Sequence, residues 1–69
     1  MTLRELIETQ TKDLSLIKVH VSAEDKVRGD GMIIIHDGTL ADVPEGMKDR
    51  RIMSVSNNSD GTPHYIDIY

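Results

Sequence analysis

Thr2-Leu3-Arg4-Glu5-Leu6-Ile7, close to the start of the chain, predicts a short helix. Thr2 and Glu5 have the spacing of a capping box, in which the threonine hydroxyl accepts from the Glu5 amide and the glutamate reaches back to the Thr2 amide. Leu3, Leu6 and Ile7 follow at helical spacing and form one apolar face. We expect the helix to end near residue 10 or 11. So short a helix is unstable alone, and we expect it to lie on a sheet.

The other regular segments have the patterns of β-strands. Residues 16–22 and 64–69 alternate apolar and polar side chains, which predicts one buried and one solvated face, with Ile66 and Ile68 inward in the second segment. Residues 32–35 are an unbroken apolar run, which favours a central strand covered on both faces. Residues 51–56 predict a further strand, whose register is open between Ile52 inward and Met53 with Val55 inward.

Turn residues place the connections between these segments. Asp37-Gly38 predicts a tight hairpin between residues 32–35 and residues 39–41. Residues 23–31 are a polar connection closed by Gly29-Asp30-Gly31, and Pro44 predicts a single helical turn. Residues 57–63 are a loop that joins the last two strands as a second hairpin. The chain is thus predicted to be one small α+β domain, residues 1–69, with the N-terminal helix packed on an antiparallel sheet of about four to five strands.

Composition excludes several classes of protein. The 69 residues contain no Cys, Phe or Trp, so the core is aliphatic and neither a disulfide scaffold nor a thiolate metal site is available. Small domains of this kind often gain stability by oligomerising, and a homodimer is expected at a free strand edge, near residues 39–41 or along the terminal strand. The net charge is −4 and the basic residues are scattered, which argues against direct nucleic-acid binding.

The sequence also predicts the cellular setting. No apolar run approaches the ~20 residues that span a bilayer, so no membrane partner is expected. Met1 opens directly onto a polar helix rather than a signal peptide, which predicts a cytoplasmic protein.

No catalytic or metal-binding motif is found. His20, His36 and His64 lie on separate predicted segments without the spacing of a zinc site. Ser54 or Ser56 could be combined with His64 and Asp67, but the chain has no nucleophile elbow and no oxyanion loop. We therefore expect no enzyme activity, no catalytic residue, no bound metal and no cofactor.

The predicted partner-binding residues are Tyr65, Asp67, Tyr69, Arg50 and Arg51. The two tyrosines are the only aromatic residues besides histidine, and with Asp67 they occupy alternate positions of one strand and share a face. Tyrosine is enriched in binding hot spots, although these side chains would equally serve to cover a thin core. Arg50 and Arg51 are suited to an acidic partner, or to a solvated strand edge that discourages aggregation.

The order of these segments resembles that of small proteins encoded by bacteriophages and prophages. The resemblance is carried by Met1-Thr2-Leu3-Arg4-Glu5-Leu6-Ile7, Asp42-Val43-Pro44-Glu45, Arg51-Ile52-Met53-Ser54-Val55 and Tyr65-Ile66-Asp67-Ile68-Tyr69. It covers most of the chain, except that residues 23–31 are longer and more charged than in those proteins.

The resemblance implies a non-catalytic protein that binds and inhibits a host protein in the host cytosol, including a defence system such as a CRISPR effector. One alternative is a homo-oligomer that holds a signalling nucleotide between its subunits. Another is a small structural or assembly accessory protein.

Overall fold

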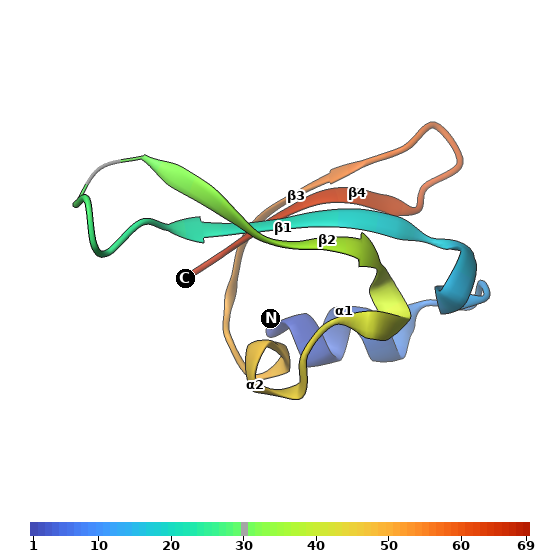
Figure 1. Cartoon of the computed structure of the whole chain (residues 1–69). Coiled ribbons are helices and arrows are strands. Elements are labelled where there is room, and N and C mark those ends of the chain that lie inside the picture. Colours follow the sequence, from blue (N-terminus) through green and yellow to red (C-terminus); the bar gives the residue numbers. More distant parts are fainter. Residues whose placement is uncertain (30) are drawn as a thin grey trace.

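The computed structural model describes residues 1–29 and 31–69, and the predicted turn at Asp30 lies outside them. A sheet of β1 (Lys18–Glu24), β2 (Met32–Thr39), β3 (Ile52–Asn57) and β4 (Pro63–Ile68) forms one layer. The second layer runs along one face of this sheet and contains α1 (Leu3–Thr9), the 3₁₀ turn η2 (Leu40–Asp42) and α2 (Glu45–Lys48) (Figure 1). A further 3₁₀ turn, η1 (Leu14–Leu16), leads from α1 into β1. The α+β class and the N-terminal helix on a sheet are confirmed.

The sheet is mixed rather than antiparallel throughout. Its strand order is β2-β1-β4-β3, with β1–β2 and β3–β4 antiparallel and the central pair β1–β4 parallel. Ile66 pairs with Val21 and Ile68 with Ala23, so four apolar side chains form one block beneath the helices. The terminal strand is therefore an interior strand, and the prediction that it offers a free edge was wrong.

The apolar run at residues 32–35 is not a central strand covered on both faces. It is the first half of β2, which lies at the edge of the sheet and pairs only with β1. Met32, Ile33 and Ile34 are 43%, 44% and 54% exposed. Ile33 pairs with Ala23 on the helix-covered face, where the β1–β2 hairpin projects beyond the helical layer (Figure 1). Met32 and Ile34 pair with Glu24 and Ser22 and lie on the other face of the sheet.

Asp37-Gly38 does not form the predicted hairpin turn. Both residues lie inside β2, where Asp37 pairs with His20 and Gly38 with Val19. A primed turn needs positive φ at its first or both central residues, and Gly38 is not among the glycines with positive φ. The hairpin instead turns between Glu24 and Met32, where Gly29 and Gly31 have φ of 84° and 73°. Tertiary pairing with the whole length of β1 overrode the local turn preference.

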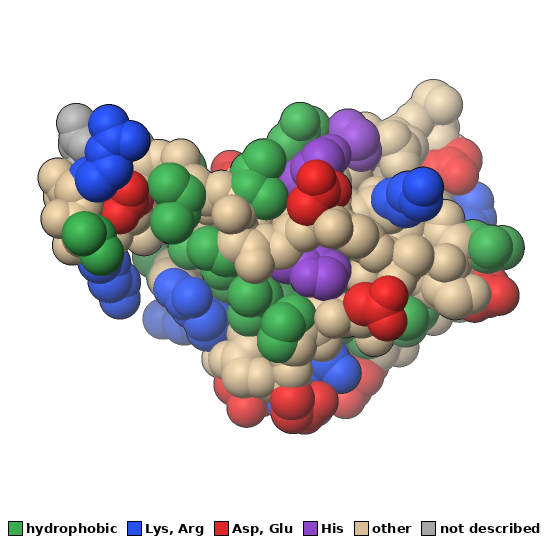
Figure 2. Space-filling view, in the orientation of Figure 1, with side chains coloured by type: hydrophobic (Ala, Val, Ile, Leu, Met, Phe, Trp, Pro, Cys, Tyr) green, Lys and Arg blue, Asp and Glu red, His purple; other side chains and the backbone are tan. Residues whose placement is uncertain are grey.

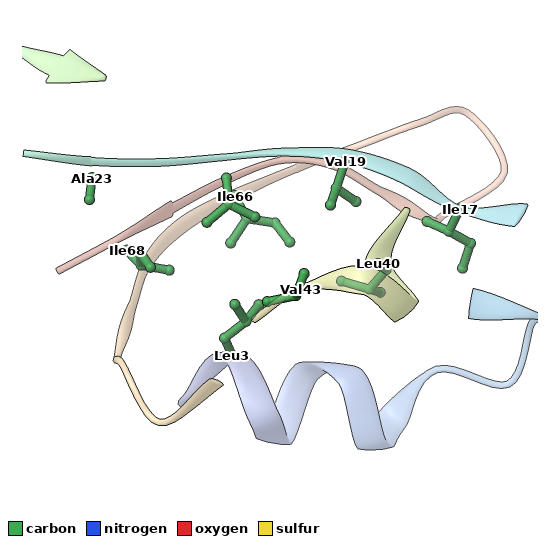
Figure 3. Close-up of a cluster of buried hydrophobic side chains, with 9 residues drawn as sticks. Leu3, Ile17, Val19, Ala23, Leu40, Val43, Ile66 and Ile68 are labelled. Atoms are coloured by element: carbon green, nitrogen blue, oxygen red, sulfur yellow. The ribbon is translucent and has the colours of Figure 1, made fainter. Parts of the chain in front are cut away.

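The core is aliphatic, as the composition predicts. Side chains from the strands converge on Leu3 of α1 and on Leu40 and Val43 beside η2 (Figure 3). Ile66 and Ile68 are fully buried, which confirms the inward residues predicted for the last strand. Ile52 and Val55 both pack against this core because the pairing of β3 shifts register between Ile52 and Ser54. This shift in pairing explains why neither predicted register of residues 51–56 holds alone: Ile52 and Val55 both face the core.

The local signals at the helix ends are confirmed. The Thr2 hydroxyl accepts from the Glu5 amide at 3.2 Å, and the Thr2 amide donates to Glu5 Oε1 at 2.9 Å. Pro44 precedes the single helical turn α2, at its N-cap. The guanidinium of Arg4 joins α1 to α2 through Glu45 and Asp49. Within the described residues, no helix has the length and apolar character needed to cross a membrane.

Candidate protein-binding face

No helix of the described residues covers the second face of the sheet. α1, α2 and η2 all lie on the opposite side (Figure 1). Strand alternation points the residues between the core positions towards this uncovered face. Its middle is a row across all four strands, in which Asp37, His20, Tyr65 and Ser56 are successive partners. We call this row and its neighbours the outer face.

Aromatic rings occupy the centre of the outer face. The rings of His20 and Tyr65 are stacked, with centroids 4.7 Å apart and planes 20° from parallel. The His64 ring meets Tyr65 edge-on at 4.7 Å and His20 at 5.5 Å. Tyr65 remains 44% exposed. Its ring is thus held in position by two neighbours while much of its surface is still open to a partner.

His20 also faces a carboxylate. Its Nδ1 lies 3.2 Å from Asp37 Oδ1, but the angle is not that of a hydrogen bond and this enclosed nitrogen has no other partner in the described part of the chain. The Asp37 carboxylate therefore lies next to the ring that is stacked on Tyr65.

A second row on the outer face is polar except at its β2 end, where Ile34 pairs with the buried Ser22 and is 54% exposed. Ser22 pairs with Asp67, and Asp67 in turn pairs with Ser54. The Ser54 hydroxyl donates to Asp67 Oδ2 at 2.9 Å, which fixes the carboxylate beside the aromatic cluster. Aromatic anchors bordered by satisfied polar groups are the usual anatomy of a protein-binding patch.

The serine–histidine–aspartate combination does not assemble. Ser54 donates directly to Asp67, while the ring of His64 contacts His20 and Tyr65. His36 is directed elsewhere, with its Nε2 3.0 Å from the Thr39 carbonyl oxygen. In residues 1–29 and 31–69, no three His, Asp or Glu side chains gather in a way that could hold a metal.

The structure divides the five predicted binding residues. Tyr65 and Asp67 lie together on the outer face. Tyr69 follows the end of β4, is largely exposed, and donates its amide to the Arg51 carbonyl at 3.0 Å. The Arg50 carbonyl accepts from the Leu3 amide at the start of α1. Tyr69 and the two arginines therefore belong to the end of the sheet near the helix start, several residues along the strands from Tyr65.

Two features of the outer face were missed by the sequence reasoning. His20 was expected on the solvated face of the sheet with Tyr65, but the linear pattern did not show that parallel pairing would stack the two rings. The exposed residues of β2 were taken as a covered strand. The exposure of β2 could have been predicted from the sequence, because one short amphipathic helix cannot cover both faces of a sheet.

A polar groove of about 270 Å³ lies between η1 and the β3–β4 connection. Its charged groups are two lysines and two aspartates, of which Lys12 pairs with Asp60 while Asp13 accepts from the hydroxyl and the amide of Ser15. Asp60 accepts from the hydroxyl and the amide of Thr62 and pairs with Lys12 at 3.3 Å. These contacts, the Thr62 hydroxyl first, lower the pKa of Asp60 to about 2. Both aspartates of the groove are therefore engaged by residues of the chain itself.

Comparisons of this chain with family models, curated proteins and solved structures give no match.

Proposed function

We propose that this protein is a non-catalytic binding protein that docks its outer face onto another protein. The observation that carries the proposal is Tyr65, which is half-exposed and yet held by stacking on His20 and by the edge of His64. Tyrosine is enriched at hot spots because it combines a large apolar ring with a hydroxyl.

The contacts of His20 and His64 with the Tyr65 ring favour a high affinity for a partner protein. Ordering a mobile side chain at an interface costs about 0.5–1.5 kcal/mol, and a ring that is already stacked loses less freedom on binding. The surrounding groups are polar: Ser56 lies across from Tyr65, Asp67 is hydrogen-bonded to Ser54, and Asp37 lies beside His20. Such a rim excludes water from a central aromatic contact.

The shape of the outer face favours a macromolecular partner over a small molecule. Small ligands bind in concave sites that bury most of their surface. The one groove described above lies away from the aromatic row and is lined by none of its residues. The aromatic row instead crosses the surface of a sheet, which suits the broad surface of a protein.

The resemblance to small phage-encoded proteins suggests the class of partner. On that basis we propose a host protein in the cytosol, with a defence component such as a CRISPR effector as the leading kind. Inhibition would then follow from occupying the partner's own working surface.

The test begins by cross-linking the protein to its partner in host lysate and then titrating the purified partner. Tyr65→Ala should weaken binding by about thirtyfold, the equivalent of a hot spot of about 2 kcal/mol. Leu16→Ala is the matched control, because it truncates another exposed side chain away from the outer face. Circular dichroism on both variants reports whether they are folded. Normal binding by folded Tyr65→Ala would show that the outer face is not the contact surface.

A further inference from the structure

We infer that the outer face recognises a basic patch of its partner protein, in which lysine or arginine side chains flank an apolar pocket that receives Tyr65. This inference rests on the proposed function and deepens it by naming the chemistry of the partner's surface. The observation behind it is the placement of two carboxylates, Asp37 and Asp67, on different sides of the aromatic cluster.

The pairing of the strands fixes the positions of these carboxylates. Asp37 lies in the same row as Tyr65, with His20 between them. Asp67 follows Tyr65 by two residues in β4, so it lies in the second row on the same face. Strands about 4.8 Å apart, with a rise of about 6.7 Å for two residues, place the two aspartate Cα atoms roughly 12 Å from each other. The negative charges therefore border the exposed ring on two sides.

Neither carboxylate is neutralised by the part of the chain that the structure describes. The side chain of Asp37 is 69% exposed, and its ionisable neighbour is the His20 ring, which is not in hydrogen-bond geometry. Asp67 accepts the Ser54 hydroxyl through Oδ2. No described lysine or arginine forms an ion pair with either aspartate. Since an ionised carboxylate has about four acceptor positions, both retain capacity for a cation of the partner.

The remaining charges of this face do not cancel the two aspartates. The aromatic row and the second row together contain these two carboxylates and no lysine or arginine. Lys18 is exposed one row beyond them, where it pairs with Thr39. At the hairpin end of β1, Glu24 is the exposed acid and lies close in sequence to the exposed Lys26. The unbalanced negative charge is therefore centred on the rows around Tyr65.

Apolar side chains lie between the carboxylates. Tyr65 is 44% exposed and Ile34, at the β2 end of the second row, is 54% exposed. Figure 2 shows hydrophobic, histidine and acidic side chains side by side over the strands, on the side away from the helices. Lysine and arginine suit such a mixture, because their aliphatic stems cover apolar surface while their charged ends reach an acid, and arginine also stacks on aromatic rings. A nucleic acid is disfavoured, because its phosphates would meet the two carboxylates.

Complementary charge of this kind mainly raises the rate of association and excludes wrong partners. Tyr65 and the charges therefore have separable roles. Loss of the ring should speed dissociation at every salt concentration. Loss of a carboxylate should slow association, and only where salt does not already screen the charge.

Selection from a displayed library of random peptides on the immobilised full chain tests the inference without a purified partner. We expect the selected peptides to carry lysine or arginine on both sides of an apolar residue. They should bind Tyr65→Ala at least about tenfold more weakly, as expected for a contact with a hot spot. Circular dichroism establishes that this variant is folded.

Neutral variants of the carboxylates test the charge itself. Asp37→Asn and Asp67→Asn should each weaken binding of the selected peptides by about two- to fivefold at low ionic strength. The difference should disappear as the ionic strength rises from about 0.05 M to about 0.5 M. Glu8→Gln is the matched control: it removes one negative charge from an exposed position of α1, in the other layer, and should leave binding unchanged.

The outcomes separate this inference from the proposed function. Neutral or acidic peptides that still require Tyr65 would overturn the basic patch and leave the docking of the outer face in place. Peptides that bind folded Tyr65→Ala normally would contradict both. An equal loss in Asp37→Asn and Glu8→Gln, or a library that yields no binding peptide, would also overturn the basic patch.

Discussion

Leu3 is the position at which the attachment of the helix to the sheet is best tested. It is the buried residue of α1 and is 0% exposed, in contact with a core cluster to which the strands contribute Ile66 and Ile68. Leu3→Ala removes buried methyl groups and leaves a cavity that the surrounding aliphatic side chains fill incompletely. Changes of this kind cost about 2–5 kcal/mol, and we expect about 3 kcal/mol here.

That loss is large relative to the stability of so small a domain. Chains of this size have a free energy of unfolding of roughly 3–10 kcal/mol. A loss of about 3 kcal/mol lowers Tm by roughly 10–25 °C. Thermal and urea unfolding, both followed by circular dichroism at one protein concentration, measure the change.

Leu16→Ala is the control for this experiment. It is the same substitution on a side chain that is 79% exposed, and it should change the free energy of unfolding by less than about 0.5 kcal/mol. If the two variants differ by less than 1 kcal/mol, then Leu3 does not anchor α1 to the sheet and the two-layer packing described above is incorrect.

Two further predictions concern groups at the surface. Thr2→Ala removes the hydroxyl that caps α1 and should lower the free energy of unfolding by about 1 kcal/mol, seen as a lower urea midpoint; Thr11→Ala, beyond the helix, should leave that midpoint in place. Because the pKa of folded Asp60 is about 2, below its ordinary value of 3.8, the stability it contributes is present above about pH 4 and is lost as the pH falls towards 2. Asp60→Asn should therefore destabilise the protein at pH 6 and match the unmodified protein near pH 2. An equal difference at both pH values would assign the effect to packing rather than to ionisation.

The local elements were predictable because their causes are local. The capping box at Thr2 and Glu5, the single turn after Pro44, and the inward Ile66 and Ile68 all follow from contacts within a few residues or from strand alternation. The β3–β4 hairpin was also predictable, since it joins neighbours in sequence. The aliphatic nature of the core follows from composition alone.

The candidate site was predictable only in part. Tyr65 and Asp67 were chosen from their alternate positions on one strand, and the structure places both on the outer face with Ser54. The role of His20 depends on a parallel pairing between segments about 45 residues apart, which no periodicity reports. Tyr69 is only four residues from Tyr65, yet it lies with Arg50 and Arg51 at the end of the sheet near the start of α1.

Sequence was sufficient for the class of the domain, its helix start, its aliphatic core and the inward residues of its last strand. The order of the strands in the sheet and the exposure of the β2 side chains could be determined only from the three-dimensional structure. Residues 32–35 read as a covered strand and Asp37-Gly38 as a turn, because each local preference was considered without its partners. In the folded chain β1 pairs with all of β2, so Gly38 stays in the strand, and β4 takes the central place beside β1. The pairing of β1 with β2 outweighs the local turn preference, and the pairing of β1 with the distant β4 determines that β2 remains at the edge.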